Sequence, residues 1–122
     1  MKTYSIKDYT YNQLYKVYIG DDPEELIKKS GICVDQPFRA ATGEIDDHIA
    51  LCFLEENEHF SANINAIVHE AYHAMFYAFT SRGVTIEDEN HEHVAYYLGW
   101  LTEQLYYTIY KHDKRRKTSN TE

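Results

Sequence analysis

The chain has 122 residues, the length of a single domain, and 43% of them are hydrophobic and 15% aromatic. This composition can supply a hydrophobic core and excludes an intrinsically disordered chain. The formal net charge of −8 argues against a general nucleic-acid binder and against docking on an anionic membrane, because both of those partners are themselves negative. Seven His and twelve Tyr residues are high counts for this length.

The charge is unevenly spread along the chain. Residues 111–122 hold five basic and two acidic residues, a net +3, which leaves −11 on residues 1–110. Short charged ends of this kind are usually solvated and frayed. We therefore expect an N-terminal arm over residues 1–13, one domain over residues 14–111 and a basic flexible tail over residues 112–122.

The sequence predicts a cytoplasmic protein. Its first residues contain no apolar stretch typical of a signal peptide, and no run approaches the roughly 18 apolar residues of a membrane span. Cys33 and Cys52 are too few for a disulfide framework and do not form a CxxC pair. Free cysteines are the ordinary state in a reducing compartment.

The first half of the chain carries signals for strands and one short helix. Residues 1–13 are polar and tyrosine-rich without a clear period, whereas residues 14–19 are β-branched and aromatic and predict a strand. A helix is expected over residues 23–30, because Asp22 can cap it and Pro23 suits its first turn.

Further β-type segments follow that helix. Residues 32–45 contain short β-type stretches interrupted by Pro37 and Gly43. After two aspartates that favour a turn, the apolar run over residues 48–54 predicts a strand, and residues 55–60 predict a polar loop.

Two long helices are expected in the second half, over residues 61–81 with Ser61 as the cap, and over residues 90–111. The apolar stripes that should face the core are Ile64, Val68, Ala71, Met75 and Phe79 in the first helix, and Val94, Leu98, Leu101, Leu105 and Ile109 in the second. The order of elements predicts an α+β fold, with a small antiparallel or mixed sheet packed on two helices.

The first long helix contains an H-E-x-x-H motif that runs from His69 to His73. Residues four apart lie on one face of a helix, so both imidazoles can reach one Zn²⁺ ion. Glu70 lies at the edge of the same face, where its carboxylate can accept a proton from water. The alternative interpretation is an unconnected pair of surface histidines on an amphipathic helix.

A catalytic zinc site usually has three protein ligands and an open position. The continuation found in metzincins is absent here, because Phe76 and Phe79 stand where that pattern requires Gly and His. An acid on the following helix is the other route, and Glu92 lies near the start of the second long helix. Its neighbours His91 and His93 remain alternatives for the third ligand.

Eighteen residues separate the H-E-x-x-H motif from Glu92. This arrangement resembles that of the gluzincin family of zinc metallopeptidases. The order and spacing are similar to thermolysin-like and aminopeptidase-like enzymes reduced to a minimal zincin core, and to small HExxH proteins encoded in phages and prophages. The resemblance covers residues 64–101. It implies Zn²⁺ held by His69, His73 and Glu92, with Glu70 as general base, and a phage-associated location as an alternative to the cytoplasm.

Other residues gain a role only if this site exists. Tyr96 lies one turn after Glu92 and is a candidate catalytic residue that would hydrogen-bond an oxyanion. Gly99, inside the same helix, suggests a close approach between helices. Cys52 is a possible soft metal ligand, although a buried strand cysteine is the simpler interpretation. By resemblance, the strand over residues 48–54 would form a substrate-binding edge.

Three functions follow as hypotheses. The first is a zinc metallopeptidase that acts on a peptide or protein substrate. The second is a non-catalytic, zinc-stabilised binding or structural protein, possible in a phage context. The third is a regulatory protein that binds a protein partner through its acidic body and basic tail, in which the motif is accidental. Histidines 48, 59 and 112 are expected at the surface.

Overall fold

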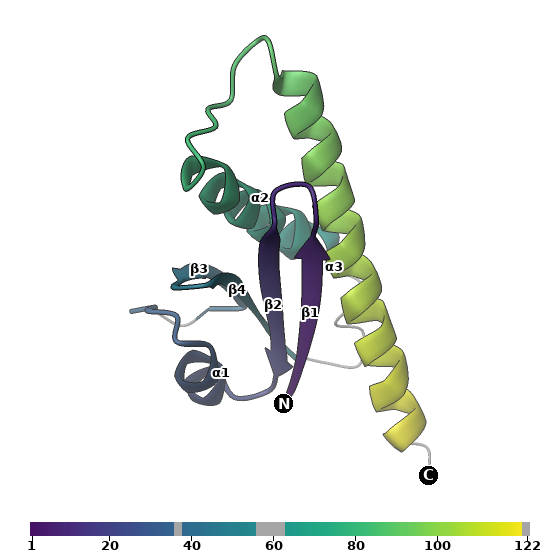
Figure 1. Ribbon diagram of the computed structural model, residues 1–122. Coiled ribbons are helices and arrows are strands. Elements are labelled where there is room, and N and C mark those ends of the chain that lie inside the picture. Colours follow the sequence, from purple (N-terminus) through teal and green to yellow (C-terminus); the bar gives the residue numbers. More distant parts are fainter. Residues whose placement is uncertain (36–37, 56–62, 121–122) are drawn as a thin grey trace.

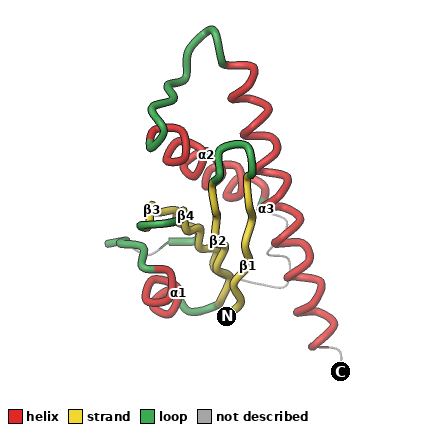
Figure 2. Tube along the Cα trace, in the orientation of Figure 1, coloured by secondary structure: helices red, strands yellow, loops and turns green. Residues whose placement is uncertain are grey.

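The computed structural model describes residues 1–35, 38–55 and 63–120. These residues form a four-stranded mixed sheet and three helices, so the predicted α+β class is confirmed (Figures 1 and 2). In chain order the elements are β1 (Lys2–Asp8), β2 (Gln13–Gly20), α1 (Pro23–Ser30), β3 (Ala40–Ile45), β4 (His48–Leu54), α2 (Ile64–Thr80) and α3 (His91–Asn120).

The sheet has the strand order β1-β2-β4-β3. The pairs β1–β2 and β3–β4 are antiparallel, and β2 and β4 run parallel to each other. Since β4 has a neighbour on each side, the expectation that residues 48–54 form an edge is wrong, and β3 is the edge on that side. The physical reason is that β4 is an almost continuous apolar run that is buried on both faces, as interior strands are.

Strand β1 was missed by the sequence analysis, which expected an irregular arm over residues 1–13. Its pairing with β2 extends from Lys2 opposite Ile19 to Asp8 opposite Gln13. Only Ile6 and Asp8 of β1 are buried. A strand that buries so few side chains, one of them a carboxylate, gives a weak alternating pattern.

Helix α1 covers one face of the sheet and agrees with the prediction. The carboxylate of Asp22 accepts a hydrogen bond from the amide of Glu24 at 3.0 Å, and Gly31 adopts the left-handed conformation (φ 82°) that closes the helix. Leu26 is buried in a small cluster that also contains Tyr18, Ile32, Ala50 and Cys52. This smaller core lies on the α1 side of the sheet.

Helices α2 and α3 pack on the other face and form the main core (Figure 1). Helix α2 is capped at its N-terminus by Asn63, whose side chain accepts from the amide of Ala66 at 3.1 Å. Ser61, the expected cap, lies outside the described residues. In α3 the core positions are Val94, Tyr97, Leu101, Leu105 and Ile109, which match the predicted stripe except that Tyr97 replaces Leu98.

Helix α2 is rotated about its own axis relative to the orientation that the sequence predicts, so a different face of the helix is buried. Its buried face is rich in alanine, which lets the backbone lie close to the sheet, and consists of Ile67, Glu70, Ala71, Ala74, Met75, Ala78 and Phe79. Four large apolar residues point outward instead, and we call them the α2 stripe: Ile64, Val68, Tyr72 and Phe76, with exposed fractions of 48%, 38%, 44% and 46%. The prediction that Ile64 and Val68 face the core is therefore wrong.

Helix α3 continues to Asn120, so residues 112–120, which the sequence analysis assigned to a basic flexible tail, are helical. His112 is buried, as is the following Asp113. The Nε2 of His112 is hydrogen-bonded to the carboxylate of Glu55 at 3.0 Å, and its Nδ1 is hydrogen-bonded to the Tyr4 hydroxyl at 2.7 Å.

His48 is also buried, so two of the three histidines expected at the surface are not there. His59, the third, lies outside the described residues. Within the described ranges, no helix has both the length and the apolar character needed to cross a membrane.

Candidate metal centre on helix α2

The two histidines of the motif converge on one point. In α2, His69 and His73 lie one turn apart on the exposed side, and their Nε2 atoms are separated by 3.1 Å. Two nitrogens that bind one zinc ion at about 2.0–2.1 Å with tetrahedral geometry lie about 3.3 Å apart. The spacing of the two Nε2 atoms is therefore close to that of two ligands on one zinc ion.

Glu70 is placed differently from the two histidines. It is buried on the sheet side of α2, and its Oε2 lies 3.9 Å from the Nε2 of His69. The other oxygen, Oε1, accepts a hydrogen bond from the hydroxyl of Thr42 at 2.9 Å. One carboxylate oxygen is therefore held by the sheet while the other faces the imidazole.

Thr42 is a site residue that the sequence analysis missed. It lies in β3, the edge strand, 28 residues before Glu70. A threonine in a short strand carries no motif, and only the packing of β3 against α2 brings the two residues together. No signal in a single sequence would identify it.

An open cavity of about 560 Å³ adjoins the site. It lies between the start of β3 and the first turns of α2, and is lined by Arg39, Ala40, Asn63, Asn65, Ala66, His69 and Glu70. The candidate centre is therefore accessible from solvent on the side of the edge strand.

The predicted third ligand, Glu92, lies elsewhere in the described structure. It is exposed in the first turn of α3, and the next residue, His93, stacks on Phe79 near the end of α2, with ring centroids 6.2 Å apart. Phe79 follows His73 by six residues, or about 9 Å along a helix. The described part of the chain contains no group of three or more His, Cys, Asp or Glu side chains placed to hold a metal ion.

The role of Glu92 as a ligand therefore stays a prediction. Of its two alternatives, His93 is already joined to the hydroxyl of Tyr11 at 2.6 Å, and His91 is exposed. Tyr96 is 73% exposed on α3, and its catalytic role also stays a prediction. A Cβ placed on Gly99 would meet nothing within 4 Å, so the expected close helix approach at that glycine is wrong.

Cys52 lies apart from the two histidines. It is buried in the α1-side cluster, and its thiol donates to the carbonyl oxygen of Leu26 at 3.8 Å. Burial raises the pKa of the Cys52 thiol to about 11. This residue is a core cysteine, as the simpler interpretation had it.

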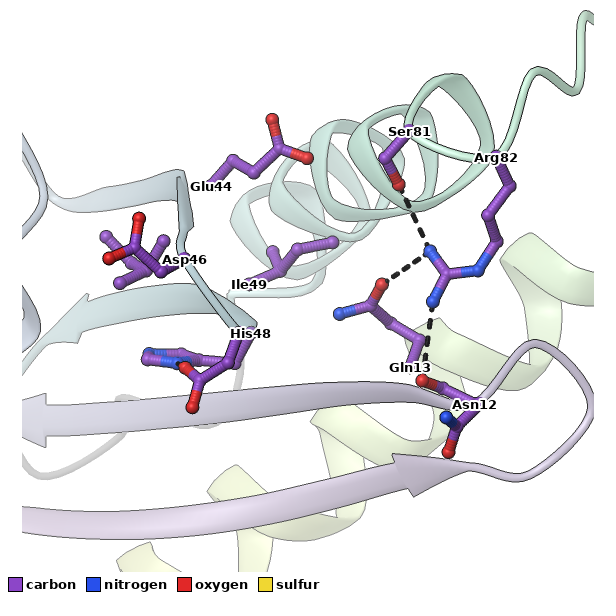
Figure 3. A pocket seen from close by; sticks show the side chains of 10 residues that line it. Asn12, Gln13, Glu44, Asp46, His48, Ile49, Ser81 and Arg82 are labelled. Atoms are coloured by element: carbon purple, nitrogen blue, oxygen red, sulfur yellow. Dashed lines mark hydrogen bonds and ion pairs between the residues drawn. The ribbon is translucent and has the colours of Figure 1, made fainter.

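A second cavity, of about 190 Å³, lies at the other end of α2 (Figure 3). Arg82 lines this cavity. Its guanidinium donates to the Gln13 side chain at 2.8 Å and to the backbone oxygens of Tyr11 and Asn12 at 2.9 and 3.3 Å. Its guanidinium is thereby committed to fixing the β1–β2 turn to the end of α2. We interpret this cavity as structural.

His48 lines the same cavity from the start of β4. Its Nδ1 donates to the Asp47 carboxylate at 2.6 Å, and this hydrogen bond lowers the pKa of Asp47.

No protein-family model, curated protein or solved structure matches this chain. The interpretation of the centre consequently rests on the geometry of His69, Glu70, His73 and Thr42.

Proposed function

We propose that this protein is a zinc-dependent metallopeptidase. The observation that carries the proposal is the 3.1 Å separation of the Nε2 atoms of His69 and His73, beside the carboxylate of Glu70. This separation is close to the roughly 3.3 Å between two nitrogens that bind the same zinc ion. The donor set also fits zinc, since imidazole nitrogen is one of its commonest ligands.

In this proposal His69 and His73 hold the cation. When bound, Zn²⁺ supplies Lewis-acid polarisation of a peptide carbonyl and lowers the pKa of water. Glu70 acts as the general base, because its Oε2 faces the pair while Thr42 fixes Oε1. The carboxylate takes a proton from the attacking water and passes it to the leaving amine. Glu70 therefore ends the reaction as the carboxylate with which it began.

Glu92 is the proposed third ligand. Since it lies in the first turn of α3, the proposal requires that turn to approach α2 when the metal binds. A Glu92→Gln variant is expected to lower zinc affinity at least tenfold, whereas Glu89→Gln, an exposed acid three residues earlier, should leave it unchanged. Equal affinities for the two variants would remove Glu92 from the ligand set.

The main test measures metal content and hydrolysis together. The protein is expected to bind about one zinc ion per chain by mass spectrometry of the intact protein, and to cleave a fluorescent denatured protein. Glu70→Gln should keep the metal and lose hydrolysis, while the His69→Ala, His73→Ala double variant should lose both. Glu103→Gln, an exposed residue of α3 outside the proposed site, is the control and should retain both zinc and activity. Absence of zinc binding, or full activity of Glu70→Gln, would contradict the proposal.

A zinc-stabilised binding protein is the second candidate, favoured by the exposed apolar surface of the α2 stripe. In that case a chelator would lower the melting temperature substantially, and no cleavage of any denatured protein would be detected.

A further inference from the structure

The α2 stripe forms a continuous apolar ridge on the surface. Ile64, Val68, Tyr72 and Phe76 follow one another at intervals of four residues, and each is between 38% and 48% exposed. The rings of Tyr72 and Phe76 are stacked, with centroids 6.5 Å apart and planes at 23°. Side chains at every fourth position form one of the kinds of ridge through which helices pack against each other.

The surface of α2 carries no formal charge apart from its histidines. Its one acidic residue, Glu70, is buried, and it has no Lys or Arg. The rest of the chain is strongly acidic, with a net charge of −8 for the whole molecule. A basic partner would therefore find nothing to pair with on α2. Two copies of this acidic chain, in contrast, can meet on α2 without placing like charges against each other.

The side chains of the stripe also change in size along the helix. The smaller Ile64 and Val68 lie at its N-terminal end, and the larger Tyr72 and Phe76 lie at its C-terminal end. An antiparallel contact between two copies places the small end of each against the large end of the other, and also opposes the helix dipoles favourably. A parallel contact would place aromatic rings against aromatic rings and leave gaps at the other end.

The area of the stripe suits the centre of such a contact. Four half-exposed side chains offer a few hundred Å², which is the size of a functional apolar patch, while a standard interface buries about 800 Å² on each partner. The remainder would come from polar neighbours of the stripe outside the metal-centre cavity, such as Thr80, which is exposed. An apolar centre inside a polar rim is the usual anatomy of an interface.

We infer that this protein forms a two-fold symmetric dimer in which the α2 stripe of one copy packs antiparallel on the α2 stripe of a second copy. In this arrangement Val68 contacts Tyr72 of the other copy, and Ile64 contacts Phe76. His69 and His73 each follow a stripe residue and lie about 100° further around the helix, so they flank the contact. The dimer therefore forms with or without metal, and goes beyond the proposed enzymatic function.

The first experiment measures self-association by sedimentation velocity over a range of protein concentrations. Tyr72→Glu places two carboxylates at the centre of the contact and should weaken the dimer at least 100-fold. Tyr107→Glu, at a tyrosine on α3 with a similar exposed fraction of 49%, is the matched control and should leave it unchanged. Added salt should strengthen association, because the two acidic copies otherwise repel each other.

The second experiment tests the antiparallel register. In a Cys33→Ser background, a mixture of Ile64→Cys and Phe76→Cys chains should form a disulfide between the two variants, and neither variant alone should form one. A monomer at all concentrations overturns the inference, as does a dimer sensitive to Tyr107→Glu and not to Tyr72→Glu. A monomer that binds neutral lipid vesicles or an apolar peptide through the stripe overturns it as well.

These outcomes are independent of the metal centre. Tyr72→Glu should retain zinc binding if the proposed function is correct, and the His69→Ala, His73→Ala variant should retain the dimer. Loss of one property therefore does not imply loss of the other.

Discussion

The hydroxyl of Thr42 donates a hydrogen bond to Oε1 of Glu70 across 2.9 Å, and so connects the edge strand β3 to helix α2 at the candidate metal centre. A buried carboxylate needs such partners, because an unpaired one costs several kcal/mol to bury. The same contact fixes which oxygen of Glu70 faces the histidines. Thr42 is therefore a positioning residue, and its effect is separable from metal binding.

We expect Thr42→Val to reduce kcat of peptide hydrolysis by about 10- to 100-fold, as is typical when the support of a catalytic group is removed. Zinc content should stay at the wild-type level, because His69 and His73 are untouched. Thr42→Ser, which keeps the hydroxyl, should restore most of the activity. Thr102→Val, which removes a hydroxyl bonded within α3, is the control. An unchanged kcat for Thr42→Val would exclude the positioning role.

A buried chain of three oxygen groups connects β1, β2 and α3. Tyr97 donates to Oδ2 of Asp8 at 2.7 Å and accepts from the hydroxyl of Tyr15 at 2.6 Å. Burial raises the pKa of Tyr15 to about 12 and that of Tyr97 well above its ordinary value, so both hydroxyls stay protonated and can donate.

Tyr97→Phe leaves Asp8 without this donor and Tyr15 without its acceptor. We expect a loss of about 2–3 kcal/mol in the free energy of unfolding, measured by urea denaturation. Tyr15→Phe removes only the outer hydroxyl and should cost about 1 kcal/mol. If the two variants were equally stable, the Asp8–Tyr97 contact would not contribute as described.

The end of α3 is expected to contribute to stability. A chain truncated after Lys111 loses the buried residues His112 and Asp113, and with them the hydrogen bonds that His112 makes with Tyr4 and Glu55. We expect a fall of several degrees in the melting temperature, measured by circular dichroism. A chain ending at Arg115 keeps both buried residues and should melt like the full chain.

The two cysteines should differ sharply in reactivity. Cys33 is exposed and Cys52 is buried, so a thiol reagent at pH 8 should label one cysteine rapidly and the second only after unfolding. Rapid labelling of both thiols in the native protein would contradict the buried position of Cys52.

The pKa of Cys52 also predicts a dependence of stability on pH. Burial raises it from 9.0 to about 11, so the folded state favours the neutral thiol. The contribution of the buried neutral thiol to the free energy of unfolding is fully present below pH 9. It is lost as the pH rises towards 11, and the total loss is about 2–3 kcal/mol. The difference in unfolding free energy between the wild type and Cys52→Ala should therefore shrink over this interval. A constant difference would show that Cys52 is more hydrated than its position implies.

Local signals in the sequence predicted most of the elements. Asp22 and Gly31 bound α1 as expected, because a cap and a left-handed glycine act on their immediate neighbours. The four-residue spacing of His69 and His73 likewise brought two imidazoles together, since helical periodicity alone determines that contact.

Features that depend on contacts between distant parts of the chain were not predicted. Glu70 was expected at the edge of an exposed face, but β3 covers it, and the strand that covers it is brought there by its pairing with β4. The position of Glu92 depends on where α3 begins relative to α2, which the polar connection between them does not encode.

The high tyrosine count has a partial explanation that the sequence analysis did not find. Tyr4, Tyr11, Tyr15 and Tyr97 each use the ring for packing and the hydroxyl for a hydrogen bond to a partner at least 82 positions away. A tyrosine can serve both purposes at once. Composition showed the excess but could not assign partners that are so distant in the sequence.

Strand β1 is bound to α3 through Tyr4 with His112 and through Asp8 with Tyr97, pairs separated by 108 and 89 residues. A ribosome releases the N-terminal strand long before it has made the helix that secures it. Until then the β1–β2 hairpin can form, but Oδ2 of Asp8 lacks its donor Tyr97, and Ile6 lacks the helices that complete the main core. Loop closures of this length slow folding, so the nascent chain is expected to complete its native structure only after α3 has emerged.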